Sequence, residues 1–307
     1  MTEKTHITVL KEEGVEALNI KPDSIVVDAT LGAHGHADLI MSKLGKKGTF
    51  IGIDADSLAI QNATRELTGL PKIILNVGNF REINSILDAH AIEKVDAVLA
   101  DLGWRMEQFS GNGKGFSFQV DEPLVMTYGD SSLYPFTARD IVNEWEEESI
   151  DNILEGYGEE RFHGRIARNI VEARVTTPIE TTHDLVEIVK RAVPAFYRNG
   201  KINPATRTFQ ALRITVNDEL RALEDFLQKS ALRLKDGGRL AVITFHSLED
   251  RIVKHTFRTF AHDGQGDVIT KKPILPLREE IVQNPRSRSA KLRIFQKNEL
   301  NSANNSL

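Results

Sequence analysis

The chain opens with two short apolar runs that each end in a carboxylate. The run near residues 25–28 ends at Asp28, and the run near residues 50–54 ends at Asp54. An amphipathic segment at 37–44 and a glycine turn separate them. Apolar runs of this length joined by an amphipathic segment predict a β-α-β unit with parallel strands.

The same rhythm continues to about residue 101 and then stops. Further strands are expected at 72–77 and 95–100, the second followed by Asp101. Residues 104–135 carry glycine, serine and proline and favour a long loop. The remaining expected elements are helices at 137–154, 159–174 and 183–192, a long helix at 206–234 and a strand at 239–245.

This order predicts an α/β fold. We expect a doubly wound, Rossmann-like sheet that an all-α domain interrupts. The first part of the sheet domain is expected in 1–110, the inserted helical domain in 111–205, and the second part of the sheet domain in 206–307.

The first turn of this predicted sheet has the features of a nucleotide site. Gly32 and Gly35 would let a ligand approach the backbone, and Asp54, about 20 residues further on, could accept both hydroxyls of a ribose. The loop is not Gly-x-Gly-x-x-Gly, and Asp28 suits a ligand with a cationic amino-acid end. These features favour S-adenosylmethionine; the alternative is an ordinary α/β turn without a ligand.

Composition narrows the class of protein. The chain has no cysteine, so disulfides, thiolate zinc sites and thiol nucleophiles are excluded. It has no run of 18 apolar residues and no apolar leader at its start, so we expect a cytoplasmic protein without a membrane span. No metal-binding helical His-x-x-x-His spacing is present. A triad of Ser247, His246 and Asp250 lacks the Gly-x-Ser-x-Gly turn that such a nucleophile needs.

Charge is unevenly distributed although the net charge is −5. Residues 284–297 hold Arg286, Arg288, Lys291, Arg293 and a final lysine without any acid. Such a stretch could follow a phosphate backbone. It could equally be a solvated edge strand, because its second half alternates between polar and apolar residues.

Three uninterrupted blocks identify the chain as similar to a known family. Phe245-His-Ser-Leu-Glu-Asp-Arg-Ile-Val-Lys254, the block from Thr208 to Leu220 and the block from Asn284 to Arg293 closely resemble the ribosomal RNA small subunit methyltransferase H (MraW) family. The resemblance covers nearly the whole chain, in the family's order. It implies an S-adenosylmethionine-dependent enzyme that methylates N4 of a cytidine in 16S rRNA at the decoding centre, with the small ribosomal subunit as partner. It is compatible with a homodimer.

The resemblance also implies particular site residues. Carried over position by position, the cofactor would contact His34, Gly35, His36, Asp54, Phe80, Asp101 and Gln108. Asp101 is in addition the natural acceptor for a proton of the target amine, although it could serve the cofactor alone. Trp104 could stack on the target base or simply pack the insert.

The chain departs from the family pattern around this site. The family usually has glycine where His34 stands, Val-Ser-Ser-Pro-Gln where this chain has residues 104–108, and an acid and an arginine within the segment 124–128. Two other functions therefore stay open. One is a methyltransferase of the same fold that acts on a different RNA site, and the other is a catalytically weak ribosome-binding protein. Binding of S-adenosylmethionine distinguishes an enzyme from a pure binder.

Overall fold

The computed structural model describes residues 7–102 and 113–299, which form two compact units. Unit 1 comprises the described residues of Met1–Gly103 and Leu220–Leu307, and unit 2 those of Trp104–Glu219. None of the helices in these described ranges is long and apolar enough to cross a membrane.

Unit 1 contains one seven-stranded sheet in the order β3-β2-β1-β4-β5-β7-β6. The first five strands in this order are parallel, and β7 runs antiparallel to both β5 and β6. The strands are β1 Ile25–Asp28, β2 Thr49–Asp54, β3 Lys72–Val77, β4 Val95–Asp101, β5 Leu234–Thr244, β6 Gly266–Val268 and β7 Lys291–Lys297. The predicted doubly wound α/β sheet is therefore confirmed.

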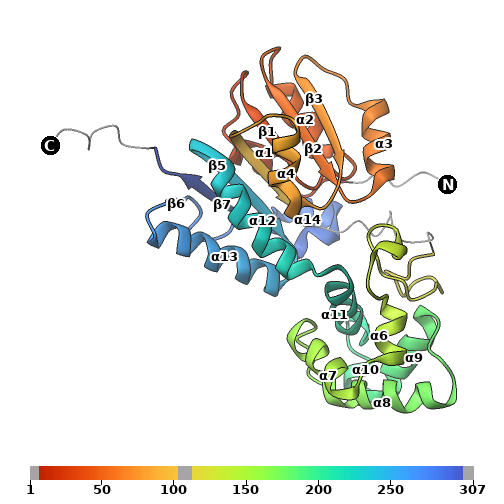
Figure 1. Cartoon of the computed structure of the whole chain (residues 1–307). Helices are drawn as coiled ribbons and strands as arrows, with labels where there is room; N and C mark the ends of the chain where they lie inside the picture. The colour runs from red at the N-terminus through yellow and green to blue at the C-terminus, as the bar shows by residue number, and fades with distance from the viewer. Residues whose placement is uncertain (1–6, 103–112, 300–307) are drawn as a thin grey trace. The chain divides into compact units, whose positions relative to one another are not determined.

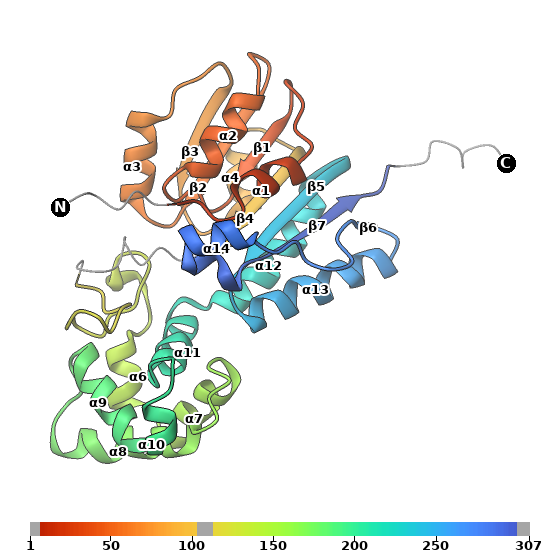
Figure 2. The same ribbon diagram turned by 180° about the vertical axis from the view of Figure 1, so that it is seen from behind.

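Helices cover both faces of this sheet (Figures 1 and 2). Neighbouring strand residues point to opposite faces, so Val26 joins the core beneath α1, α2 and α3, whereas Val27 joins the core beneath α4, α12 and α13. The helices and 3₁₀ turns of the unit are α1 Lys11–Ala17, α2 Gly35–Lys43, α3 Ser57–Glu66, η1 Phe80–Glu82, α4 Ile83–Ala89, α12 Glu219–Arg233, α13 Ser247–His262, α14 Arg278–Gln283 and η3 Pro285–Ser289.

Strand β7 corrects one of the two interpretations of the basic stretch. Residues 291–297 do form a strand, but it lies between β5 and β6. Four of its seven residues are buried. The expected solvated edge strand is therefore wrong: β6, a three-residue strand without a strong sequence pattern, takes the edge position.

Unit 2 is helical and follows β4 in the sequence, as the predicted insert does. Its core is built from buried aliphatic residues of α6, α7, α8, α9 and α11. Its elements are η2 Ser131–Leu133, α6 Ala138–Glu144, α7 Glu147–Gly156, α8 His163–Thr176, α9 Thr182–Ala192, α10 Ala195–Arg198 and α11 Thr206–Asn217.

Two helices expected to be continuous are broken. The segment 137–154 separates into α6 and α7 at Trp145, which is extended and packs edge-on against Phe136 at a ring distance of 5.0 Å. The segment 206–234 breaks at Asp218, whose φ is 49°. The side chain of Asn217 there bonds the backbone of the 126–128 loop, accepting from Tyr128 N–H at 3.0 Å. Tertiary contacts thus override helical periodicity at both positions.

Candidate functional site

The site lies at the carboxyl ends of the parallel strands of unit 1. The chain leaves β1 toward β2 on one side and later returns to place β4 on the other side of β1. This reversal of strand order is the position at which open α/β sheets bind ligands. Asp28 ends β1 and Asp101 ends β4, so two carboxylates stand at this position, and Asp54 ends the neighbouring β2.

The carboxylate of Asp54 is fixed by two backbone N–H groups. Its Oδ2 accepts from Gly32 at 2.8 Å, and its Oδ1 accepts from Asp56 at 2.8 Å. Gly32 has a φ of 58°, a conformation that costs glycine little. These two hydrogen bonds hold the orientation of the carboxylate, whose two oxygens together can accept more than two hydrogen bonds.

The turn after β1 also supports the end of β4. Asp28 is 1% exposed, and its Oδ1 accepts from Thr30 N–H at 3.2 Å. The hydroxyl oxygen of Thr30 in turn accepts from the backbone N–H of Asp101 at 2.6 Å. Thr30 was not singled out from the sequence, although a hydroxyl directly after a strand-end acid is the type of group that ties two strand ends together.

His36 lies beside Asp101. Its ring is 5% exposed, and its Nδ1 is 3.8 Å from Asp101 Oδ2. The side chain of Asp101 is 17% exposed, so this carboxylate is partly open to solvent whereas the imidazole is enclosed. The structure therefore brings together Asp101 and His36, which the sequence assigned to the same site.

His34 and Gly35 shape the start of α2. His34 has a φ of 50°, in the left-handed region that favours glycine, so the glycine that the family resemblance leads us to expect here would adopt this conformation with less strain. Its ring is oriented toward acids on α2 and α3, with Nε2 3.0 Å from Glu66 Oε2. A Cβ at Gly35 would collide with the hydroxyl of Thr8. A side chain at position 35 would therefore displace Thr8, so glycine is required here by the packing of the chain itself.

Phe80 begins η1 immediately after β3 and is half-buried. Its ring packs edge-on against Phe226, with ring centroids 5.1 Å apart and planes at 78°. Part of the ring therefore belongs to the core between the sheet and α12, and the remainder lies near the strand ends. Trp104 and Gln108 lie outside the described residues.

His246 and Glu249 form the first turn of α13, directly after β5. The Nδ1 atom of His246 accepts from Glu249 N–H at 3.4 Å, and Glu249 Oε2 accepts from His246 N–H at 3.3 Å and from Phe245 N–H at 2.8 Å. This is a capping box in which histidine replaces the usual serine or threonine. His246 therefore has a structural role at the helix start.

Asp250 corrects the expectation of a free basic stretch. Its carboxylate accepts from Arg293 Nε at 2.7 Å and from Lys291 Nζ at 2.9 Å. Although burial alone would raise it, these hydrogen bonds hold the pKa of Asp250 below its ordinary value. Two of the four cations expected to meet phosphates are thus already paired with a carboxylate, and Asp250 does not extend a serine triad. The i, i+2 spacing of Lys291 and Arg293 places both on one face of β7 and could have indicated a shared partner.

The sequence is similar to those of known proteins over nearly its whole length. Residues 3–298 match the sequence model of the MraW methylase family. A protein of Clostridium botulinum (strain Loch Maree / Type A3) named ribosomal RNA small subunit methyltransferase H is 46% identical over 95% of this chain and 98% of its own length. Proteins of the same name from Brevibacillus brevis and Clostridioides difficile are 44% and 43% identical, each over 95% of this chain and 98% of their own length.

Proposed function

The chain belongs to the MraW methylase family, is an enzyme, and, we propose, transfers a methyl group from S-adenosylmethionine to N4 of a cytidine in 16S rRNA. The observation that carries the proposal is the 43–46% identity, over 95% of the chain, to proteins named ribosomal RNA small subunit methyltransferase H. The target amine follows from the family resemblance of the blocks around residues 208–220, 245–254 and 284–293.

The residues at the strand ends fit S-adenosylmethionine. Asp54 presents a carboxylate that two backbone N–H groups hold in one orientation, which suits a pair of ribose hydroxyls. Asp28, buried beside the turn, supplies a carboxyl group near the place where a cationic amino group would lie. His34, Gly35 and His36 at the start of α2, with Phe80 and Gln108, complete the proposed cofactor contacts.

Asp101 is the proposed proton acceptor. When bound, S-adenosylmethionine supplies a methyl group on a sulfonium sulfur, and the electron pair of the broken sulfur–carbon bond stays on sulfur. The exocyclic amine gains a bond to carbon and must lose a proton. The carboxylate of Asp101 is partly exposed to solvent and stands where the strand order of the sheet reverses, so it could accept that proton.

The surroundings of Asp101 fix its position. Thr30 holds its backbone through the 2.6 Å hydrogen bond, and His36 lies against its carboxylate. A fixed acceptor orients the weakly nucleophilic amine toward the methyl group, and such orientation contributes much of the rate in a methyl transfer. No metal is needed, because the sulfonium is already an activated electrophile.

The test is transfer of a labelled methyl group to purified small ribosomal subunits, followed by mass spectrometry of the rRNA nucleosides. We expect N4-methylcytidine at one position, and loss of transfer with Asp101→Asn while cofactor binding persists. If the methyl group is found on another nucleotide, the enzyme acts on a different RNA site from the one proposed. Binding to the ribosome without binding of S-adenosylmethionine would indicate a pure binding protein.

A further inference from the structure

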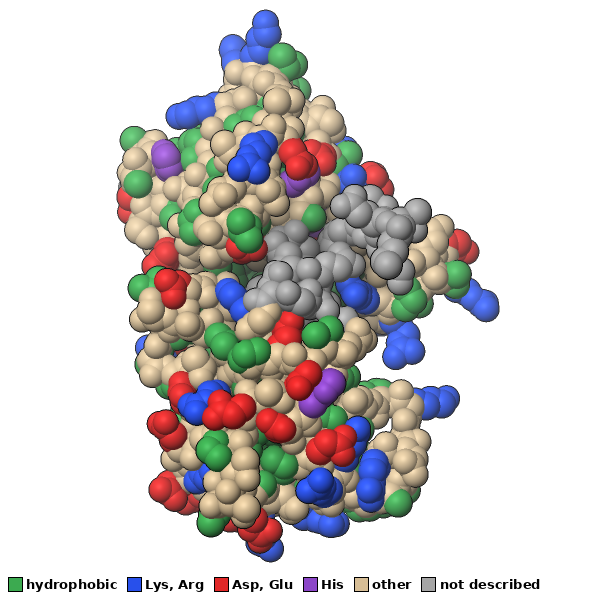
Figure 3. Space-filling model, turned by 90° about the vertical axis from the view of Figure 1, so that its right-hand side faces the viewer, with side chains coloured by type: hydrophobic (Ala, Val, Ile, Leu, Met, Phe, Trp, Pro, Cys, Tyr) green, Lys and Arg blue, Asp and Glu red, His purple; other side chains and the backbone are tan. Residues whose placement is uncertain are grey.

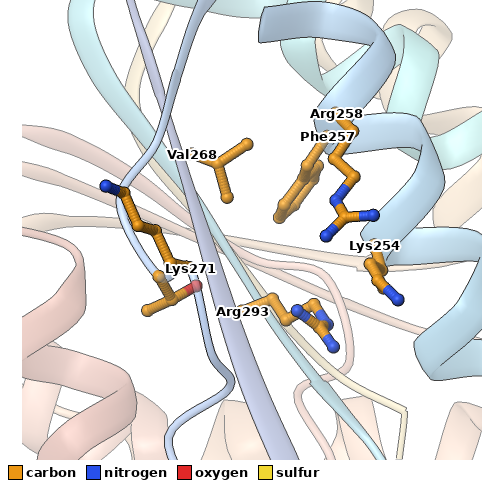
Figure 4. A pocket seen from close by; sticks show the side chains of 7 residues that line it. Lys254, Phe257, Arg258, Val268, Lys271 and Arg293 are labelled. Atoms are coloured by element: carbon orange, nitrogen blue, oxygen red, sulfur yellow. The ribbon is translucent and has the colours of Figure 1, made fainter.

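A pocket in unit 1 is lined by four cations and no acid. It has a volume of about 250 Å³ and lies between α13, the segment after β6, and β7. Lys254 and Arg258 come from α13, Lys271 from the segment after β6, and Arg293 from β7; Phe257, Val268 and Thr270 complete the lining. Figure 4 shows the charged groups of Lys254, Arg258 and Arg293 turned toward one side of the pocket, whereas the ammonium of Lys271 points away.

The charge of this pocket contrasts with that of the chain, whose net charge is −5. On the face drawn in Figure 3, acidic and basic side chains are interspersed. Among the described residues, no carboxylate lies within 4.0 Å of the charged groups of Lys254 or Arg258. Two neighbouring cations without a counter-ion repel each other, so an anion between them would be stabilised.

The remaining polar groups also suit an anion. The Nε–H of Arg293 donates a hydrogen bond to Asp250. The two terminal nitrogens of its guanidinium are further donors beside the pocket. The hydroxyl oxygen of Thr270 accepts from Ile294 N–H at 2.9 Å, so its own O–H can donate to a ligand. The apolar floor of Phe257 and Val268 lowers the local dielectric constant and strengthens these interactions.

The sheet places this pocket close to the proposed site of methyl transfer. Asp101 pairs with Ile243 across β4 and β5, and Ile243 pairs with Leu292 across β5 and β7. Arg293 is the next residue, so two strand spacings, roughly 10 Å, separate it from the backbone of Asp101. A polynucleotide that presents a base at Asp101 could therefore place a phosphate only a nucleotide or two away in this pocket.

We propose that Lys254, Arg258 and Arg293 bind a backbone phosphate of the RNA whose base is methylated at Asp101. This inference rests on the proposed rRNA substrate and adds to it a defined contact outside the cofactor site. From the sequence we expected the basic stretch 284–297 to contact phosphate. The proposal keeps only Arg293 of that stretch and adds Lys254 and Arg258 of α13.

The experiment compares two double variants. Lys254→Ala with Arg258→Ala removes the two cations that α13 contributes to the pocket. Lys46→Ala with Lys47→Ala removes two exposed lysines from the turn before β2, which β1, β4 and β5 separate from β7 in the sheet. Affinity for small ribosomal subunits and for 16S rRNA is measured between about 50 and 200 mM salt, with the cofactor present. Cofactor affinity and thermal unfolding serve as checks on folding.

The pocket variant is expected to bind on the order of ten-fold more weakly at the lowest salt, and the slope of log affinity against log salt should flatten by about 1–2. The lysine control should retain affinity and slope. Equal affinity and slope for both variants and the unchanged protein would overturn the proposal while leaving the methyltransferase function intact. Binding of inorganic phosphate to the unchanged protein and to the pocket variant is followed by NMR. If the pocket variant loses phosphate binding but keeps its affinity for RNA, the proposal is also overturned. If the unchanged protein binds cofactor but no rRNA, the proposed substrate fails as well.

Discussion

Asp54→Asn should weaken S-adenosylmethionine binding strongly, because it removes the charge that the ribose hydroxyls would contact. The substitution keeps the size of the side chain. In the native protein the two carboxylate oxygens accept from Gly32 and Asp56, each at 2.8 Å. An asparagine amide has one oxygen, so one of these backbone N–H groups would face an NH₂ group.

The magnitude follows from these contacts. A hydrogen bond to a charged acceptor is worth about 1.5–3 kcal/mol, and each 1.4 kcal/mol is a factor of ten in affinity. Loss of one charged ribose contact should therefore raise Kd about 10- to 150-fold. The mispaired backbone N–H should lower the free energy of unfolding by about 1–3 kcal/mol. The weaker cofactor binding and the lower stability are expected together, but only the change in binding requires that Asp54 contacts the ligand.

The assay is isothermal titration calorimetry with S-adenosylmethionine, alongside urea unfolding. Asp56→Asn is the matched control, because the side chain of Asp56 caps α3 by accepting from Leu58 N–H at 2.9 Å, and asparagine caps helices equally well. The control should keep both affinity and stability. An unchanged Kd in folded Asp54→Asn would refute the assignment of this carboxylate to the ribose.

Three further predictions concern catalysis and stability. Asp101→Asn should slow single-turnover methyl transfer about 10²- to 10⁴-fold at saturating cofactor with a small change in cofactor affinity; a normal rate would show that Asp101 is not the proton acceptor. Asp250→Ala should cost about 2–3 kcal/mol in urea unfolding at pH 7, because it leaves Arg293 without its carboxylate. Since the folded pKa of Asp250 is depressed, this difference should shrink as the pH falls below about 4, and a constant difference would argue against the pair. Burial and a 2.7 Å hydrogen bond to Glu160 raise the pKa of Tyr197 to about 12, so absorbance titration should miss this phenol at pH 10, and Tyr197→Phe should remove stability that is present below pH 10 and lost toward pH 12.

The parallel half of the fold was predictable from the sequence because its signals are local. The apolar runs before Asp28, Asp54 and Asp101 have strand length and end in polar residues, and connected β-α-β units leave few possible topologies. The position of the acids at one edge follows from the parallel order of the strands.

The parts that could not be predicted depend on contacts between distant residues. Asn217 and Asp218 are only a weak indication of a helix end, and the bonds from Asn217 to the 126–128 loop cannot be read from the sequence. The partner of Gly35 is Thr8, nearly thirty residues earlier, so the role of that glycine could not be read from its own loop. The pairing of Lys291 and Arg293 with Asp250 joins a strand to a helix some forty residues before it. The run of basic residues in 284–297 therefore predicted a basic surface, whereas in the folded chain Asp250 pairs with two of these cations.

The most direct test of the account is mass spectrometry of 16S rRNA from cells with and without this gene. We expect one cytidine to lose its N4-methyl group when the gene is deleted. The unaltered gene should restore the methyl group, and a gene carrying Asp101→Asn should not restore it at an equal protein level. An rRNA methylation pattern identical in both strains would contradict the assigned substrate, and restoration by Asp101→Asn would contradict the assigned chemistry.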